Sequence, residues 1–329
     1  MRENAKAKKT PLLVLVGPTA VGKTAFSLDI AKRRNIDIIS GDSVQVYRGM
    51  DVGSAKATPA ERAQAPHYMI DLLDPDEPFT VADFQERATR LIAESAARGR
   101  LPTIVGGTGL YIESVVYGYQ FSDAVADEAA RERWNAVADA EGTESLHATL
   151  QARDPVSAAR IHPNDRKRLI RALEIFDATG RPMSEQAQKR EKSSPYELCM
   201  IGLTMERDKL YARIEARVDA MLEEGLVEEV RTLLARGYDR SLPSMQAIGY
   251  KEIAAYVAGE ISYDEAVYSL KRNTRRFAKR QLSWFRAMPQ IHWVDVTDTA
   301  NFITHSDRIN DIIATTFPSS DDPFNLPEA

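Results

Sequence analysis

The sequence contains a single cysteine, Cys199, and no long apolar run. One cysteine cannot form a disulfide or a cysteine-based zinc site within the chain, and a reducing compartment, the cytoplasm, is its expected location. Without a stretch of about 18 apolar residues, no membrane-spanning helix is expected. The N-terminal segment MRENAKAKKT is basic but lacks the apolar region of a secretion signal, so we interpret residues 1–10 as a flexible basic tail.

Excess charge of one sign is also scarce. The formal net charge of −5 argues against a uniformly basic nucleic-acid binder, and the composition is that of an ordinary globular protein. The charge is unevenly distributed, however, because residues 267–290 contain several lysines and arginines but no acid. One surface element is therefore expected to be strongly positive. The five histidines lack a metal-ligand spacing, and none is assigned a catalytic role.

Predicted strands and helices alternate over residues 11–119. We predict strands at 12–16, 36–40 and 102–105, and helices at 23–33 and 79–98. This alternation is typical of an α/β fold with a parallel sheet, which binds ligands beyond the carboxyl ends of its strands.

Residues 120–195 differ from this pattern, because they have helical spacing and no convincing strand. They predict a helical insertion. After it we expect core strands at 199–203 and 291–296, helices over 208–288, and a disordered tail from residue 315.

Residues 12–26, LLVLVGPTAVGKTAF, place a glycine-containing loop between a strand and a helix. The loop matches G-x-x-x-x-G-K-[ST], in which successive backbone N–H groups turn toward a phosphate at a helix N-terminus. The lysine can neutralise the distal phosphates, and the threonine hydroxyl can ligate Mg²⁺. We therefore predict a di- or triphosphate site formed by Gly17, Pro18, Thr19, Ala20, Val21, Gly22, Lys23 and Thr24.

The sequence offers no strong strand that ends in a metal-binding aspartate, which a kinase or ATPase of this type would be expected to have. The acid best placed at a strand end is Asp42, which can act as a metal ligand, a general base or a turn former. The segment Gly106-Gly107-Thr108-Gly109 also follows a predicted strand. It can form either a flexible turn or a close approach to a ligand, with Thr108 as a hydrogen-bond donor.

On a helix, residues 270–286 separate into two faces. Leu270, Phe277, Gln281 and Trp284 form a stripe that is expected to pack on the core. The opposite half carries Lys271, Arg272, Arg275, Arg276, Lys279 and Arg280. A polyanion would relieve the repulsion among these cations, with counterion release, although some can instead face a diphosphate or form an ordinary basic surface.

Two smaller groups of basic residues allow either phosphate contacts or salt bridges. Arg166, Lys167, Arg168 and Arg171 cluster at a predicted helix start after Asn164-Asp165. Arg213 and Arg217 lie four residues apart on one helix face, with Glu215 and Glu223 as competing partners. Both interpretations stay open for each group.

Six segments occur in one order along the chain: GPTAVGKT, DSVQVYRGMDVGSAK, VGGTGLY, RIHPNDRKRLIRALE, QAIGYKE and TRRFAKRQLSWFR. Together they closely resemble the bacterial tRNA dimethylallyltransferases, also called tRNA isopentenyltransferases. The departures are small: Ala57 stands where a proline commonly follows Ala-Lys, and Val52 and Ser54 replace the usual isoleucine and threonine. Eukaryotic relatives often carry a zinc finger, which one cysteine cannot build.

The resemblance implies a P-loop NTPase-like core, residues 11–119 and 196–314, and a helical insertion, residues 120–195, that clamps the tRNA anticodon stem-loop. It implies transfer of the dimethylallyl group of dimethylallyl diphosphate to N6 of the adenosine 3′ of the anticodon, in tRNAs that read codons beginning with U. The phosphate loop then binds a leaving group, released as diphosphate, rather than ATP. A cytoplasmic monomer that uses Mg²⁺, bound at Thr24, is expected.

The resemblance also assigns roles to residues. Asp42 is the implied general base, and Lys23, Thr108 and Arg217 are implied to stabilise the departing diphosphate, while Gln45 is suited to reading a base edge. The implied tRNA contacts are Asp42, Ser43, Val44, Gln45, Arg131, Arg166, Lys167, Arg168, Leu169, Ile170, Gln246, Ala247, Ile248, Gly249, Tyr250, Lys251, Thr274, Arg275, Arg276, Phe277, Ala278, Lys279, Arg280 and Gln281.

Two other functions share part of this pattern. A P-loop kinase of a small metabolite needs the phosphate loop but not the basic helix. An RNA-binding NTPase without transfer chemistry needs the basic helix but not Asp42 together with Thr108.

Overall fold

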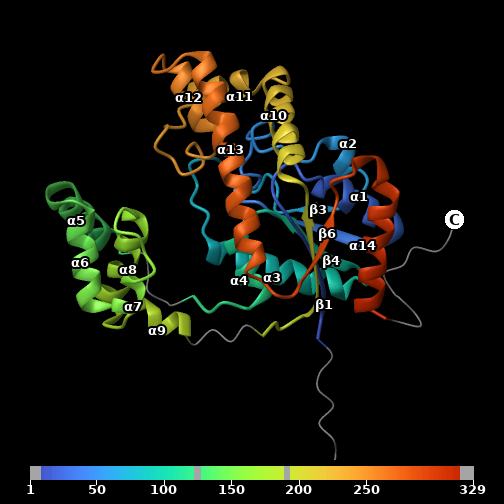
Figure 1. Cartoon of the computed structure of the whole chain (residues 1–329), viewed down its shortest axis with the longest axis horizontal. Coiled ribbons are helices and arrows are strands. Elements are labelled where there is room, and N and C mark those ends of the chain that lie inside the picture. Colours follow the sequence, from blue (N-terminus) through green and yellow to red (C-terminus); the bar gives the residue numbers. More distant parts are fainter. Residues whose placement is uncertain (1–8, 122–126, 189–192, 319–329) are drawn as a thin grey trace, which may run out of the picture. The chain divides into compact units, whose positions relative to one another are not determined.

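The computed structural model describes residues 9–121, 127–188 and 193–318 (Figure 1). The predicted tail of residues 1–10 lies outside these ranges except for Lys9 and Thr10, and so does the C-terminal segment from residue 319. The chain divides into two compact units. The first unit comprises Met1–Gly118 and Ser194–Ala329, and the second comprises Tyr119–Ser193.

A six-stranded sheet forms the centre of the first unit. Its order is β3-β2-β4-β1-β5-β6, and every neighbouring pair is parallel, which confirms the predicted α/β fold. The strands are β1 (Pro11–Val16), β2 (Ile36–Gly41), β3 (His67–Tyr68), β4 (Leu101–Gly106), β5 (Glu197–Thr204) and β6 (Ile291–Asp295). The sequence did not predict β3, because two residues are too few to show a strand period.

The position of each strand in the sheet accounts for its residue pattern. Residues 12–16 of β1 are fully buried because a central parallel strand is covered on both faces, and this is why β1 is an unbroken apolar run. Val16 pairs with Gly106, and Gly41 also pairs with Gly106, so β1, β2 and β4 end at the same level. The loops that follow these three strands therefore meet at one edge of the sheet.

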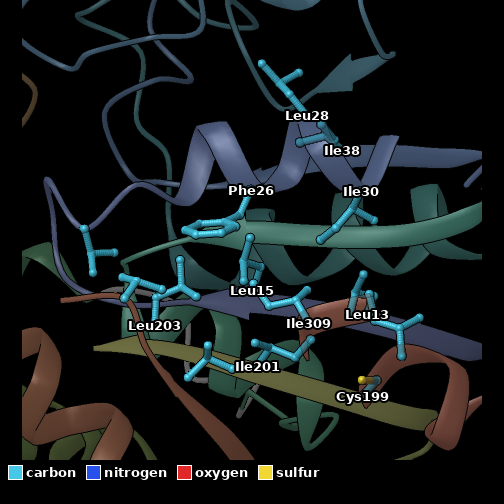
Figure 2. Close-up of a cluster of buried hydrophobic side chains, with 14 of the residues drawn as sticks. Leu13, Leu15, Phe26, Leu28, Ile30, Ile38, Cys199, Ile201, Leu203 and Ile309 are labelled. Carbon is cyan, nitrogen blue, oxygen red and sulfur yellow. The ribbon is translucent and has the colours of Figure 1, made fainter. Parts of the chain in front are cut away.

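Helices α1 (Lys23–Arg33) and α14 (Phe302–Thr316) pack against the same face of the sheet (Figure 2). Phe26 of α1 and Ile309 of α14 share a buried cluster with Leu13 and Leu15 of β1. The sequence analysis missed α14 and placed the start of the disordered tail at residue 315. That boundary is wrong, because α14 extends to Thr316 and Phe317 is buried against the same cluster.

The remaining helices of the first unit complete its layers. They are α2 (Pro59–Arg62), α3 (Val81–Ala97), α4 (Gly109–Val116), α10 (Arg207–Glu223), α11 (Leu226–Ala235), α12 (Tyr250–Val257), α13 (Tyr263–Arg286) and the short 3₁₀ helix η1 (Thr299–Asn301). α3 packs on β2 and β4 and contacts α4. α10 to α13 share a second core that includes Val218, Val230, Tyr250 and Leu270, and these four helices account for the helical region predicted over 208–288.

Every regular element among the described residues of the second unit is a helix. It contains α5 (Glu128–Glu141), α6 (Thr143–Arg153), α7 (Pro155–Ala158), α8 (Arg166–Thr179) and α9 (Met183–Gln188). Leu146 and Leu150 of α6 and Leu169 and Leu173 of α8 are fully buried in a core of their own. Across the described parts of both units, no helix combines the length and apolar character needed to cross a bilayer.

Candidate active site

A cavity of about 1050 Å³ lies in the first unit, beyond the carboxyl ends of β1, β2 and β4. Its walls come from the phosphate loop, from the segment that follows β2, from the end of β4 and from α10 and α13. It brings together Lys23, Thr24, Asp42 and Arg217, four residues that the sequence analysis singled out. A volume of this order suits a small-molecule substrate with room for part of a second one.

The phosphate loop has the backbone that its sequence predicts. Gly22 precedes α1 with φ +109°, a conformation that a residue with a Cβ rarely adopts, and α1 begins at the next residue. Three side chains stabilise the loop by hydrogen bonds to its backbone. The Lys23 ammonium donates to the carbonyls of Gly17 and Pro18, each at 2.9 Å. Arg213 Nε donates to Ala20 O at 2.9 Å, and Gln281 Oε1 accepts from Thr19 N at 2.9 Å.

The cavity carries positive charge that no acid neutralises by direct contact. Burial, and to a lesser extent the neighbouring Arg217, lower the pKa of Lys23 to about 7, although Asp42 opposes both effects. Burial also lowers the pKa of Arg217. Within residues 9–121, 127–188 and 193–318, neither side chain forms a salt bridge. Two enclosed cations without counter-ions favour the binding of an anion such as a diphosphate.

Asp42 uses its two carboxylate oxygens differently. Oδ1 accepts hydrogen bonds from Val44 N at 2.8 Å and Gln45 N at 3.3 Å, so the turn-forming role is realised. No hydrogen bond reaches Oδ2 from the described part of the chain, and Asp42 lines the cavity. One oxygen therefore fixes the loop, and the other is available to a substrate as a base or a metal ligand.

Thr108 and its glycines make structural contacts of their own. Thr108 Oγ1 accepts from Ser43 N at 3.2 Å and so supports the segment after β2. Thr108 is not among the residues that line the cavity, and its predicted role as a donor to the diphosphate stays a prediction. A Cβ at Gly107 would lie 2.1 Å from Gln281 Nε2, and one at Gly109 would lie 2.5 Å from the Trp284 ring. These glycines allow α13 to approach the end of β4 closely, and Gly107 also lines the cavity together with Gly106.

Gln45 also differs from its predicted role as a base reader. Its Oε1 accepts from Ser40 Oγ at 2.8 Å, and its Nε2 donates to the carbonyls of Ser54 and Ala55 at 3.2 and 3.3 Å. The amide is thus satisfied by the protein, and Gln45 lines the cavity as a structural link between two stretches of its wall.

The buried face of α13 is rotated from the predicted stripe. Ala266, Leu270, Ala278, Gln281 and Phe285 are buried, whereas Trp284 is 38% exposed. Gln281 determines this phase, because its amide donates to Gly107 O at 3.0 Å and accepts from Thr19 N. A buried amide must satisfy both of its polar atoms, and the two loops satisfy them.

Some of the basic residues on the opposite face of α13 are paired with acidic residues of α10. Lys271 forms a salt bridge with Asp219 at 2.6 Å, and Arg275 forms one with Glu215 at 2.5 Å, both from α10. Arg276, Lys279 and Arg280 are exposed and have no acidic partner among the residues that the structure describes. These three cations, hereafter the exposed α13 cations, are open to a polyanion.

Several implied tRNA contacts have buried side chains. Leu169, Tyr250 and Ala278 are 0% exposed, and Ile170 and Gln281 are 7% and 6% exposed. Leu169 and Ile170 belong to the core of the second unit, and the Tyr250 hydroxyl donates to Glu229 at 2.7 Å. These five side chains are therefore not exposed to a ligand in this structure, and contact of these residues with tRNA stays a prediction. Sequence position alone did not separate the core face of each helix from its exposed face.

The basic cluster of the second unit favours the salt-bridge alternative. Arg166 donates to Asp139 at 2.5 Å and to the Asn135 side chain at 3.0 Å. Arg131 and Arg171 both pair with the buried Glu174, at 3.1 and 2.9 Å. Lys167 is exposed. Most of this cluster therefore serves the fold of the unit.

Family models match almost the whole chain. The model described as IPP transferase matches residues 45–288, and the model described as isopentenyl transferase matches residues 10–72. A protein of Geobacillus thermodenitrificans named tRNA dimethylallyltransferase is 51% identical over 92% of this chain and 96% of its own length. One of Halalkalibacterium halodurans with the same name is 53% identical over 88% of this chain and 92% of its own.

Solved structures agree with these matches. The tRNA isopentenylpyrophosphate transferase of Bacillus halodurans is 50% identical, with a TM-score of 0.72, over 94% of this chain and 97% of that one. A eukaryotic dimethylallyltransferase, captured acting on tRNA, is 26% identical with a TM-score of 0.79, over 93% of this chain and 80% of that one.

Proposed function

The chain belongs to the IPP transferase family, and from this premise we propose that its cavity holds dimethylallyl diphosphate on the phosphate loop and admits the acceptor nucleoside beside Asp42. The chain is a tRNA dimethylallyltransferase-type enzyme, which transfers the dimethylallyl group to tRNA. We assign the acceptor as N6 of the adenosine 3′ of the anticodon, in tRNAs that read codons beginning with U. We also propose that the enzyme acts as a monomer, because one chain supplies Lys23, Asp42 and Arg217 to the cavity. We propose the cytoplasm as its location, since a single cysteine fits a reducing compartment.

The proposal depends on one observation: two enclosed cations and one carboxylate line the same cavity without forming a salt bridge to each other. Lys23 and Arg217 favour an anion, while the unpaired oxygen of Asp42 favours a proton donor. A leaving diphosphate and an amine nucleophile satisfy both requirements. A nucleotide kinase would satisfy the first, but it would leave the exposed α13 cations without a role.

On the acceptor side, the exocyclic amine is a weak nucleophile because its lone pair is delocalised into the purine ring. We assign Asp42 Oδ2 as the general base. N6 forms a bond to C1 of the allyl group, the bond from C1 to the diphosphate oxygen breaks, and the N6 proton passes to the carboxylate. The adenosine must leave the stack of the anticodon loop to reach this position.

On the donor side, negative charge grows on the diphosphate as the bond to C1 breaks. The Lys23 ammonium, the Arg217 guanidinium and the N–H groups of the phosphate loop are placed to stabilise that charge in an enclosed site. A bound diphosphate also favours the protonated form of Lys23, because an adjacent anion opposes the effect of burial.

The residues present fit a magnesium ion held mainly by substrate. Thr24 lines the cavity and offers one hydroxyl oxygen, whereas the described residues contain no cluster of three acidic, histidine or cysteine side chains for a metal. Mg²⁺ commonly binds in this way, with few protein ligands and several phosphate and water oxygens. When bound, it would neutralise charge on the diphosphate.

For tRNA docking we assign the exposed α13 cations of the first unit and the exposed Lys167 of the second unit. The helical unit, Tyr119–Ser193, remains our candidate for the clamp on the anticodon stem-loop. Its Arg131 and Arg166 are already paired with acids, which leaves its other exposed groups and its shape to make the contacts.

One experiment tests the proposed function. The protein is incubated with unmodified tRNA, Mg²⁺ and dimethylallyl diphosphate labelled in the allyl group, and in parallel with ATP labelled in the γ-phosphate. Label in the RNA from the allyl donor alone is expected, at the adenosine 3′ of the anticodon after nuclease mapping. Transfer of phosphate from ATP, or no transfer of the allyl label, would refute the proposal.

A further inference from the structure

Glu229 of α11 lies outside the six motif segments of the sequence analysis, yet it binds the loop that forms one wall of the cavity. Its carboxylate accepts hydrogen bonds from three consecutive backbone N–H groups, those of Asp51 at 2.9 Å, Val52 at 2.7 Å and Gly53 at 3.1 Å. The hydroxyl of Tyr250 donates to the same carboxylate at 2.7 Å. A run of backbone amides around one anion is a strong, charge-assisted arrangement.

In the described part of the chain, the Glu229 carboxylate is held by hydrogen bonds and not by a salt bridge. Glu229 forms no salt bridge with any residue that the structure describes, so its charge is stabilised by the four donors alone. Gly53 fits against the ring of Tyr250 so closely that a Cβ would lie 2.7 Å from it. Glu229, Tyr250 and residues 51–53 therefore interlock, although they come from three separate parts of the chain.

Residues 51–55 are connected through Gln45 to Asp42, the proposed base. Val52, Ser54 and Ala55 line the cavity, and the carbonyls of Ser54 and Ala55 accept from Gln45 Nε2. Gln45 N in turn donates to Asp42 Oδ1. Hydrogen bonds, joined by the backbone between residues 53 and 54 and by the Gln45 side chain, thus connect the carboxylate of Glu229 to that of Asp42. Ala55 has φ +47°, a conformation that this segment holds only with support from its surroundings.

We propose that Glu229 is a positioning residue for the acceptor side of the reaction, a role that rests on the proposed function. It fixes residues 51–55, which hold Gln45, and Gln45 helps to hold the Asp42 carboxylate toward the acceptor amine. It makes no contact with the phosphate loop in the described structure, so donor binding should not depend on it.

The test compares Glu229→Ala and Glu229→Gln with the matched variant Glu228→Gln, whose carboxylate is exposed and lies near only Arg231, at 3.5 Å. For Glu229→Ala we expect kcat for tRNA to fall by roughly 10- to 100-fold, since misplacing a catalytic group by about 1 Å costs on the order of 100-fold. Glu229→Gln keeps one acceptor oxygen and should lie between Glu229→Ala and the unsubstituted protein. The Kd for dimethylallyl diphosphate, measured by calorimetry, should change less than about twofold in all three variants.

Hydrogen exchange separates positioning from a general loss of fold. In Glu229→Gln the amides of residues 51–53 should exchange faster, while those of residues 17–24 keep their protection. Unchanged kcat in Glu229→Ala, or a donor Kd that weakens as much as kcat falls, would overturn the inference. Failure of the proposed function looks different, because the unsubstituted protein and Glu228→Gln would then fail to label tRNA at all.

Discussion

The donor side of the cavity, residues 17–24, and the acceptor side, residues 42–56, differ in how much of their structure a local sequence motif predicts, although Arg213 and Gln281 also hold the donor loop from distant positions. The donor side is a strand, a loop and a helix start in succession, and the two glycines of its motif have the positive φ angles that such a loop requires. The acceptor side depends on Thr108, Glu229 and Tyr250, which are distant in sequence. A local motif can therefore identify where the anion binds, but the position of the base is a property of the whole unit.

The largest effect expected from this comparison is on Asp42. Replacing Asp42 with alanine should lower kcat by about 10²- to 10⁴-fold, because general-base catalysis contributes a factor of this order. The Kd for unmodified tRNA, measured by filter binding, should change only a few-fold, since the exposed α13 cations are untouched. Asp42→Asn is the matched control, because its amide oxygen can still accept from Val44 N and preserve the turn.

Both variants should lose turnover to a similar extent if proton acceptance is the role of Asp42. Full activity in Asp42→Asn would assign the residue to the turn alone. A loss of tRNA affinity as large as the loss of turnover would show that Asp42 binds substrate rather than activates it.

A somewhat smaller effect is expected on the donor side. Lys23→Met keeps the length of the side chain but removes the charge, and kcat/KM for dimethylallyl diphosphate should fall by about 10²- to 10³-fold, as for the loss of one transition-state donor. Steady-state kinetics with tRNA at saturation measures the change. Gln281→Leu makes a useful comparison, because the uncharged Gln281 side chain holds the loop through Thr19 N at 2.9 Å. If the two variants were equally impaired, loop geometry rather than the Lys23 charge would explain the loss.

The donor side should also respond to pH in a direction that follows from Lys23. Its pKa of about 7 in the free protein is below the ordinary lysine value, so the ammonium is increasingly lost above pH 7. A bound diphosphate raises that pKa, so binding takes up a proton, and donor affinity should fall by up to about tenfold per pH unit above 7. Calorimetry without tRNA, at constant ionic strength and in two buffers, measures both quantities. Lys23→Met should lack this decline; an equal decline in that variant would assign it to another group.

How much the sequence predicts follows the same division. The parallel sheet, α1 and the phosphate loop are predicted because strand burial, loop glycines and helix start are local signals. Asp42 is found at a strand end, but its turn and its free oxygen are not separable by sequence. The amides of Gln45 and Gln281 look like substrate-binding groups, yet both satisfy backbone atoms of distant segments. No local pattern indicates Glu229, because its three partners are 176–178 residues away along the chain.

The smallest expected effects concern the basic residues. Arginines that look alike in the sequence differ in the structure in whether an acidic residue pairs with them. Arg276 is exposed without an acidic partner in the described ranges, whereas Arg275 pairs with Glu215 and Arg166 pairs with Asp139. Arg276→Ala should weaken tRNA binding a few-fold and reduce the slope of log K against log salt by about 1, because one phosphate contact is lost. Arg275→Ala should change the slope less, since its charge is already compensated by Glu215.

Arg166→Ala completes the series as a control for structure. Its side chain joins α8 to α5 within the second unit, so the expected result is a lower melting temperature with little change in the salt slope. Filter binding at several salt concentrations, together with thermal unfolding of each variant, separates the two effects. If Arg166→Ala lowered the salt slope as much as Arg276→Ala, its pairing with Asp139 would have to open when tRNA binds, and paired cations would count among the RNA contacts.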